Sequence, residues 1–296
     1  MTRAGALNPR LGWSARSVAS LAGIVWSLTV TSGCLADVSK TQPATEQTQA
    51  GHWLRTASAE TYIATQPRFR VLRLRRPGDA GLLAEPPTPR VGLRLAYLAT
   101  EPVDDPFAPG NHAARVVKSD DTYATFELDP CPVSGLQYLV HASLARTRPV
   151  LHIKLELVNR MDTPRTCAVW ALASFPRAGV MLAPYGDAPR SRRRLVLPFW
   201  SRLPQPGVTH GFDAMRIDLD APLRGRAFKV GLVSDAGWAA YLRGEQAILM
   251  HAARRAGMAY PEGDANVTLF QQDADGETWA EAEQVGPWSR LAPGEA

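Results

Sequence analysis

Side-chain type alternates through the carboxyl-terminal stretch Glu277-Thr-Trp-Ala-Glu-Ala-Glu-Gln-Val-Gly-Pro287. Successive side chains of a β-strand point to opposite faces, so this stretch predicts a strand with two unlike faces. The small Thr278, Ala280 and Ala282 share one face, and the other carries Glu277, Trp279, Glu281, Glu283 and Val285. Carboxylates beside an indole suit a polyol ligand, because acids accept hydrogen bonds from hydroxyl groups and the flat ring packs on the apolar side of a sugar. The alternative is a solvated acidic edge that deters strand pairing.

Glu281 and Glu283 are the candidate catalytic residues of this face. Residues two apart on a strand have bases roughly 6.5 to 7 Å apart, so each charge raises the pKa of the other in a partly desolvated cleft. One acid would then stay protonated and donate to a sugar oxygen while the other accepts. We expect both to line a concave pocket with an aromatic residue, and Glu281→Gln to weaken glycan binding without lowering the melting temperature.

From His52 onward the chain consists of short runs near period two, separated by turns rich in its 24 prolines and 23 glycines. Helical periodicity is scarce, so the pattern predicts an all-β fold, a large antiparallel β-sandwich in a single domain over residues 52–296. The expected strands are Arg68–Arg75, Val91–Leu98, Thr122–Leu128, Gly135–Leu144, Val150–Asn159, Thr166–Phe175, Gly179–Ala183, Arg194–Trp200, Ala214–Leu219, Arg226–Val233, Trp238–Leu242, Gln246–His251, Val267–Gln271 and Glu277–Val285.

The clearest local unit is a hairpin over Gly135–Asn159. If Arg146 and Thr147 form a two-residue turn, His141 lies opposite His152 and Gln137 lies opposite Glu156. The alternation predicts an inward face of Leu136, Tyr138, Val140, Leu151, Ile153, Leu155 and Leu157 and an outward face of Gln137, His141, His152, Lys154 and Glu156. Two histidines without a third ligand do not define a metal site, so we expect no metal and no cofactor.

The amino terminus has the parts of an export signal: Arg3, Arg10 and Arg16 precede an apolar run from Val18 to Val30. Thr31-Ser-Gly33 then stands directly before Cys34, which resembles a bacterial lipobox. We therefore expect residues 1–33 to be a signal peptide and Cys34 to be lipidated; a cleaved signal without lipid is the alternative. Residues 34–51 read as a polar tether. Leu35 after the cysteine favours the outer membrane, facing the periplasm.

Charge and cysteine content narrow the possible partners. The chain has 33 basic and 28 acidic residues, and because residues 1–33 hold three arginines and no acid, 30 against 28 remain after them. A nearly neutral domain has little long-range attraction for a polyanion, so we expect no nucleic-acid partner. Cys131 and Cys167 are either one disulfide or two buried thiols.

Motifs between residues 134 and 294 resemble, in their order, an uncharacterised bacterial family of unknown function within the galactose mutarotase-like superfamily. They are Ser134-Gly-Leu-Gln137, Leu157-Val-Asn159, Ala168-Val-Trp-Ala-Leu172, Gly237-Trp-Ala-Ala-Tyr241, Tyr260-Pro-Glu-Gly263, Glu281-Ala-Glu-Gln-Val-Gly-Pro287 and Leu291-Ala-Pro-Gly294. The resemblance implies a supersandwich whose concave face binds a hexose. Active members carry a histidine acid where this chain has Val169-Trp170-Ala171, and a glutamate base in the region of Glu281 and Glu283. An indole cannot protonate a ring oxygen, so the resemblance puts mutarotation in doubt.

Three functions follow, and the sequence leaves open whether the protein is an enzyme. The first is a cell-envelope lipoprotein that binds carbohydrate without turnover, through Trp279, Glu281, Glu283 and also Trp238 and Tyr241. The second is a sugar-ring enzyme of the aldose epimerase type, in which Glu281 or Glu283 is the base and His210 or His251 the acid. The third is an envelope structural protein without a small ligand.

Overall fold

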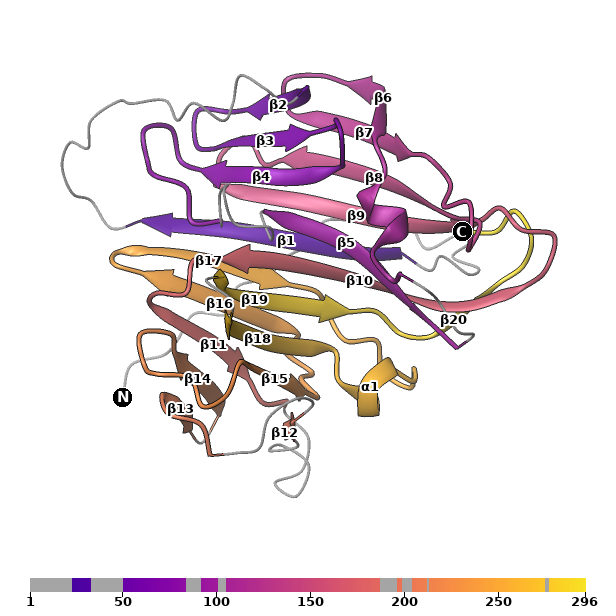
Figure 1. Cartoon of the computed structure of the whole chain (residues 1–296). Helices are drawn as coiled ribbons and strands as arrows, with labels where there is room; N and C mark the ends of the chain where they lie inside the picture. Colours follow the sequence, from indigo (N-terminus) through magenta and orange to yellow (C-terminus); the bar gives the residue numbers. More distant parts are fainter. Residues whose placement is uncertain are drawn as a thin grey trace, which may run out of the picture.

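The computed structural model describes residues 23–32, 50–83, 92–100, 105–186, 196–198, 204–211, 213–274 and 277–296. Within these ranges almost every regular element is a β-strand, and the strands form two ten-stranded antiparallel sheets (Figure 1). The exceptions are a 3-10 helix at Ala108–Asn111 and the four-residue helix α1 at Pro261–Asp264. The predicted all-β sandwich is confirmed. No helix in the described ranges has the length and apolar character needed to cross a membrane.

The first sheet, sheet A, contains the predicted hairpin and the strands predicted at Trp238–Leu242 and Gln246–His251. Its neighbouring strands pair antiparallel throughout. In spatial order the strands are β13 (Val208–His210), β14 (Ala214–Asp218), β11 (Val180–Pro184), β16 (Trp238–Arg243), β17 (Gln246–His251), β1 (Gly23–Ser32), β9 (Val150–Asn159), β8 (Leu136–Leu144), β7 (Tyr123–Leu128) and β6 (Ala114–Ser119).

The second sheet, sheet B, contains the acidic carboxyl-terminal strand near its middle. In spatial order its strands are β12 (Val196–Pro198), β15 (Ala227–Leu232), β18 (Val267–Ala274), β19 (Glu277–Val285), β10 (Arg165–Phe175), β5 (Leu93–Ala99), β4 (Arg70–Arg75), β3 (Glu60–Ala64) and β2 (Gly51–Arg55), while β20 (Ser289–Leu291) also pairs with β10. The acidic strand β19 lies between β18 and β10, so it is not an edge strand.

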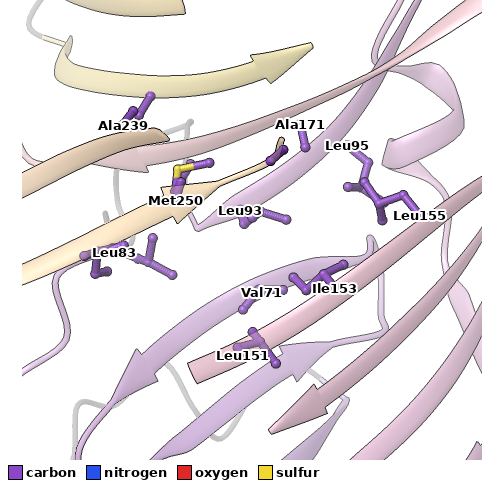
Figure 2. Close-up of a cluster of buried hydrophobic side chains, with 14 of the residues drawn as sticks. Val71, Leu83, Leu93, Leu95, Leu151, Ile153, Leu155, Ala171, Ala239 and Met250 are labelled. Atoms are coloured by element: carbon purple, nitrogen blue, oxygen red, sulfur yellow. The ribbon is translucent and has the colours of Figure 1, made fainter. Parts of the chain in front are cut away.

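The core fills the space between the sheets. Leu151, Ile153 and Leu155 of β9 are at most 1% exposed. Figure 2 shows them near Leu93 and Leu95 of sheet B. Burying one such side chain contributes about 1.5 to 3 kcal/mol, so alternate apolar residues determine which face of each strand turns inward. The predicted inward face of the hairpin is confirmed in full.

The register of the hairpin differs from the prediction. His141 pairs with Lys154 rather than His152, and Gln137 pairs with Val158 rather than Glu156. Arg-Thr is a poor pair for a two-residue primed turn, which requires positive φ at both positions or at the first. The chain instead makes a wider connection, in which Ala145 N–H donates to the Val150 carbonyl at 2.8 Å. A shift of two residues preserves the faces, whereas a shift of one would exchange them.

Some strands were missed by the pattern. They are β2, β3, β6, β13 and β20, which have three to six residues each. The edge strand β6 is exposed from its second residue onward, so no buried face imposes alternation on it. The strand β1 lies inside the predicted signal peptide and pairs with β9 and β17. Cys34 and residues 35–49 of the predicted tether lie outside the described residues, and lipidation stays a prediction.

Cys131 and Cys167 are both buried, and within the described structure they do not form a disulfide with each other. Of the two possibilities left open by the sequence, the structure has the buried thiols.

Candidate functional site

The acidic face of β19 is buried, not solvated. Ala280 and Ala282 point into the core between the sheets, while Trp279, Glu281 and Glu283 lie on the opposite face and are 4%, 5% and 1% exposed. The alternative of a solvated acidic edge is therefore wrong. Burying two carboxylates costs several kcal/mol each unless cations and hydrogen-bond donors compensate, so their partners determine what this face can do.

Glu281 is held by donors from three strands. The Arg94 guanidinium on β5 donates from Nη2 to its Oε1 atom. The same oxygen accepts from Ser174 Oγ at 3.2 Å and from Trp279 Nε1 at 3.1 Å. Arg94 is itself 3% exposed, which makes this a buried ion pair.

Glu283 is held in the same manner by a second cation. Its Oε2 atom lies 3.0 Å from Lys229 Nζ on β15 and accepts from Thr268 Oγ1 at 2.6 Å and from Trp170 Nε1 at 2.9 Å. Burial alone lowers the pKa of Lys229, but the nearby charges of Glu283 and Glu262 outweigh it and the pKa is raised. Each of the two acids is thus paired with a cation, whereas the sequence-based expectation was that one acid would stay protonated beside the other.

We call the two ion pairs the sheet B cluster: Arg94, Lys229, Glu281 and Glu283 with their hydrogen-bond donors. Aromatic rings border this cluster. Lys229 Nζ lies 4.7 Å from the centre of the Trp170 ring, and the Arg94 guanidinium carbon lies 5.1 Å from the centre of the Phe107 ring. The two rings are themselves 5.4 Å apart. Phe107 is half-buried, so it is the part of this border that reaches solvent. Cation–π contacts of this kind favour cations that have lost water.

The Tyr260-Pro-Glu-Gly263 turn has a strained conformation, and its Glu262 is near enough to Lys229 and Glu283 for their charges to affect its pKa. Glu262 and Asp264 have φ of 50° and 74°, a left-handed region that side chains other than glycine adopt rarely. The turn is held by Tyr260 N–H, which donates to Asp264 Oδ1 at 3.0 Å, and by Arg254 Nη1, which donates to the Asp264 carbonyl at 2.9 Å. Strain of this kind persists only where surrounding contacts over-determine it, and it often marks functional sites.

Glu262 is the exposed acid of this region. Loss of water around its carboxylate raises the pKa of Glu262, Lys229 opposes the change, and the charge of Glu283 raises the pKa further. The electrostatic coupling connects this surface carboxylate to the buried Glu283–Lys229 pair. A solvent-accessible acid with a raised pKa beside a charged cluster is a candidate for ligand contact.

The structure brings together only some of the residues predicted from the sequence. Trp279 joins Glu281 and Glu283, but Trp238 and Tyr241 are on β16 in sheet A. Tyr241 is buried in the core, where its ring stacks on Phe175 with centres 4.3 Å apart, and burial raises its pKa to about 12.

The histidines considered as acids are also separate from the cluster. His210 is on β13, where its Nδ1 atom lies 2.8 Å from Tyr185 Oη, and His251 is on β17. Both strands belong to sheet A, whereas Glu281 and Glu283 are in sheet B. Over the described ranges, no three His, Cys, Asp or Glu side chains gather closely enough to hold a metal ion.

Arg94, Lys229 and Glu262 were not predicted as site residues from the sequence. A signal for the first two was present: each is a single cation inside an otherwise apolar strand, Leu93-Arg-Leu-Ala-Tyr97 and Ala227-Phe-Lys-Val-Gly-Leu232. A charge within such a run is buried only with a partner, and two such charges match the two acids of β19.

Comparison with known proteins bears on the fold alone. No protein-family model matches the chain, and no curated protein matches it. A TPR-domain containing protein from Parabacteroides distasonis is 14% identical with a TM-score of 0.52, over 81% of this chain and 44% of that one. A shared fold follows, and this chain spans less than half of that protein.

Two further solved structures are less similar. A galactose mutarotase related enzyme from Lactobacillus acidophilus is 9% identical with a TM-score of 0.48, over 83% of this chain and 94% of that one. A galactose mutarotase-like protein from Lactobacillus casei is 10% identical with a TM-score of 0.47, over 83% and 96%.

Proposed function

We propose that this chain is a cell-envelope lipoprotein whose domain binds carbohydrate on sheet B without turning it over. The support is a charged cluster bordered by aromatic rings, which combines hydrogen-bonding groups with an apolar ring surface. Sugar sites need both, because a pyranose presents hydroxyl groups at its edge and C–H groups on its face. Trp279, Glu281 and Glu283, which the sequence assigns to ligand contact, belong to this cluster but are buried.

The observation that carries the proposal is the hydrogen bond from Trp170 Nε1 to Glu283 Oε2, at 2.9 Å. In the resemblance described above, Trp170 stands where active mutarotases have their histidine acid, and Glu283 stands in the region of their glutamate base. The two side chains contact each other directly here. The indole, however, has no proton that it can transfer to a ring oxygen near neutral pH, so the site is arranged for binding.

Ligand contact is expected at the exposed border of the cluster. Phe107 offers a ring face for stacking, and Glu262 offers a carboxylate that accepts hydrogen bonds from sugar hydroxyl groups. Glu281 and Glu283 act indirectly. They hold Arg94 and Lys229, and these cations contact the Phe107 and Trp170 rings. On this proposal the buried acids are positioning residues, and Phe107 and Glu262 touch the ligand.

A sugar-ring enzyme is the second candidate, because Glu262 is an exposed acid in a strained turn and its pKa is raised. An exposed acid whose pKa is shifted toward neutrality can exchange a proton with a ligand. In that case Glu262, rather than Glu281 or Glu283 with His210 or His251, would be the acid–base group.

The full-length protein should be screened on a glycan array, and any glycan that binds should be titrated against variants. We expect Phe107→Ala and Glu262→Gln to weaken binding by about tenfold each, which corresponds to about 1.4 kcal/mol. Glu277→Gln is the matched control for Glu262→Gln, because Glu277 is also an exposed glutamate but does not belong to the cluster. If no glycan binds, or if both variants bind like the control, carbohydrate binding at this site is wrong. NMR of anomer exchange on a bound sugar separates turnover from binding.

The lipid anchor is proposed from the sequence, since Cys34 lies outside the described residues. Mass spectrometry of the envelope form is expected to show diacylglycerol on an amino-terminal Cys34, in the outer membrane, and Cys34→Ala is expected to mislocalise the protein. A mature protein that begins at Met1 would contradict it. Processing at this point has a structural consequence, because it removes β1.

A further inference from the structure

Strand β1 connects two otherwise separate halves of sheet A. One half is the series β13, β14, β11, β16 and β17, and the other is β9, β8, β7 and β6. Residues Gly23–Thr29 pair with β9, and Ser27–Ser32 pair with β17 (Figure 1). In the described sheet β9 and β17 do not pair with each other. Sheet A is therefore continuous only through β1.

The sequence of β1 matches this position. Ile24, Trp26, Leu28 and Val30 alternate with Val25, Ser27, Thr29 and Thr31. Such alternation is typical of a half-buried strand, whereas the apolar part of an export signal needs only length and hydrophobicity.

The register places the two sets of β1 residues opposite matching neighbours. Leu28 is opposite Leu151 on one side and Met250 on the other, and both of these are buried in the core (Figure 2). Ser27 is opposite His152 and His251, which are half-buried. The register therefore pairs Leu28 with residues of the core, and Ser27 with half-buried residues of the neighbouring strands.

The position of β1 in the chain allows it to be removed from the sheet. It is the first strand of the described residues, and the rest of the domain is joined to it only through residues 33–49. It can therefore leave the sheet without any other strand being rethreaded. Its loss leaves the inner edges of β9 and β17 with unpaired backbone N–H and C=O groups facing each other across the width of one strand.

We propose that the space between β9 and β17 is a strand-acceptor site, filled by Gly23–Ser32 in the unprocessed chain. A form that has lost this segment binds an extended segment of another polypeptide, in which apolar side chains alternate with small or polar ones. Strand addition supplies backbone hydrogen bonds, and alternate side chains supply specificity. Here the added strand pairs on both sides, which distinguishes the site from an ordinary sheet edge. Only its opening in the cell rests on the proposed processing at Cys34.

The test uses the full-length protein with a specific protease site placed within residues 33–49. The folded protein is cut there, and a fluorescent peptide with the sequence of residues 22–33 is added. We expect the peptide to exchange with the resident fragment in the cut protein and not to bind the uncut protein. Leu28→Pro in the chain removes a backbone donor from a strand paired on both sides, so this variant is expected to exchange faster after cutting.

The matched control peptide has the same composition with each neighbouring pair of residues exchanged, which inverts the alternation. We expect it to bind about tenfold more weakly or worse, because its apolar side chains lie on the wrong face. Equal binding of the two peptides overturns the proposal. So does a cut protein that releases its fragment, keeps its melting temperature and binds neither peptide. Glycan binding on sheet B is measured on the same samples, so failure of one proposal is distinguishable from failure of the other.

Discussion

Replacement of Glu283 by glutamine tests whether the buried ion pair holds sheet B together. The side chains of Lys229 and Glu283 are 5% and 2% exposed, and Nζ lies 3.0 Å from Oε2. Glutamine keeps the shape and one acceptor oxygen for Thr268 and Trp170, but it leaves Lys229 as a buried charge without its carboxylate. Breaking a buried pair from one side costs about 3 to 5 kcal/mol. For a chain of this size that corresponds to a fall in melting temperature of about 10 °C.

Thermal and urea unfolding of the variant should be compared with Glu277→Gln, which changes the same residue type at an exposed position of the same strand. The control is expected to stay within about 0.5 kcal/mol of the parent protein. The double variant with Lys229→Met is expected to be less destabilised than the sum of the single variants, because removing both charges also removes the uncompensated one. If Glu283→Gln is no more destabilising than the control, the ion pair does not hold the sheet and the reasoning is refuted.

The same reasoning reverses the sequence-based expectation for Glu281→Gln. Arg94 is buried, so loss of the Glu281 charge is expected to lower the melting temperature as well as any glycan affinity.

Three further predictions concern the core, a surface acid and a loop. Leu155→Ala is expected to cost about 2 to 5 kcal/mol in the free energy of unfolding, and Lys154→Ala less than about 1 kcal/mol; equal losses in urea unfolding would contradict the assigned faces. The raised pKa of Glu262 means that the folded state binds this proton more tightly than the unfolded state, so stability falls as pH rises above 4.5 toward the raised folded value. Glu262→Gln removes that fall: its melting temperature should match the parent below pH 4.5 and exceed it at neutral pH, and the opposite difference would refute the sign. Gly110→Ala would place a Cβ atom 2.0 Å from the Leu95 carbonyl oxygen, so it is expected to displace the loop that carries Phe107, and near-ultraviolet circular dichroism should change; an unchanged spectrum and melting temperature would show that the loop yields freely.

Local patterns determined most strands of this protein. The bounds of β9, β17 and β19 agree with those predicted, because side-chain alternation is decided by each residue and its near neighbours. The inward face of Leu151, Ile153 and Leu155 follows from the same alternation, since one face of a strand must be apolar to be buried. Strands with no such contrast, such as the exposed β6, have no local signal and were missed.

The register of the hairpin and the pairing of the site were decided by the tertiary structure. Alternation is unchanged by a shift of two residues, so it cannot distinguish His152 from Lys154 as the neighbour of His141. Arg94 meets Glu281 across 187 positions of sequence, and that contact exists only because β10 lies between their strands and pairs with both. The sequence shows two acids on one face of β19. Whether one acid stays protonated beside the other or each binds a cation depends on which strands become neighbours, because charges interact through space and not along the chain.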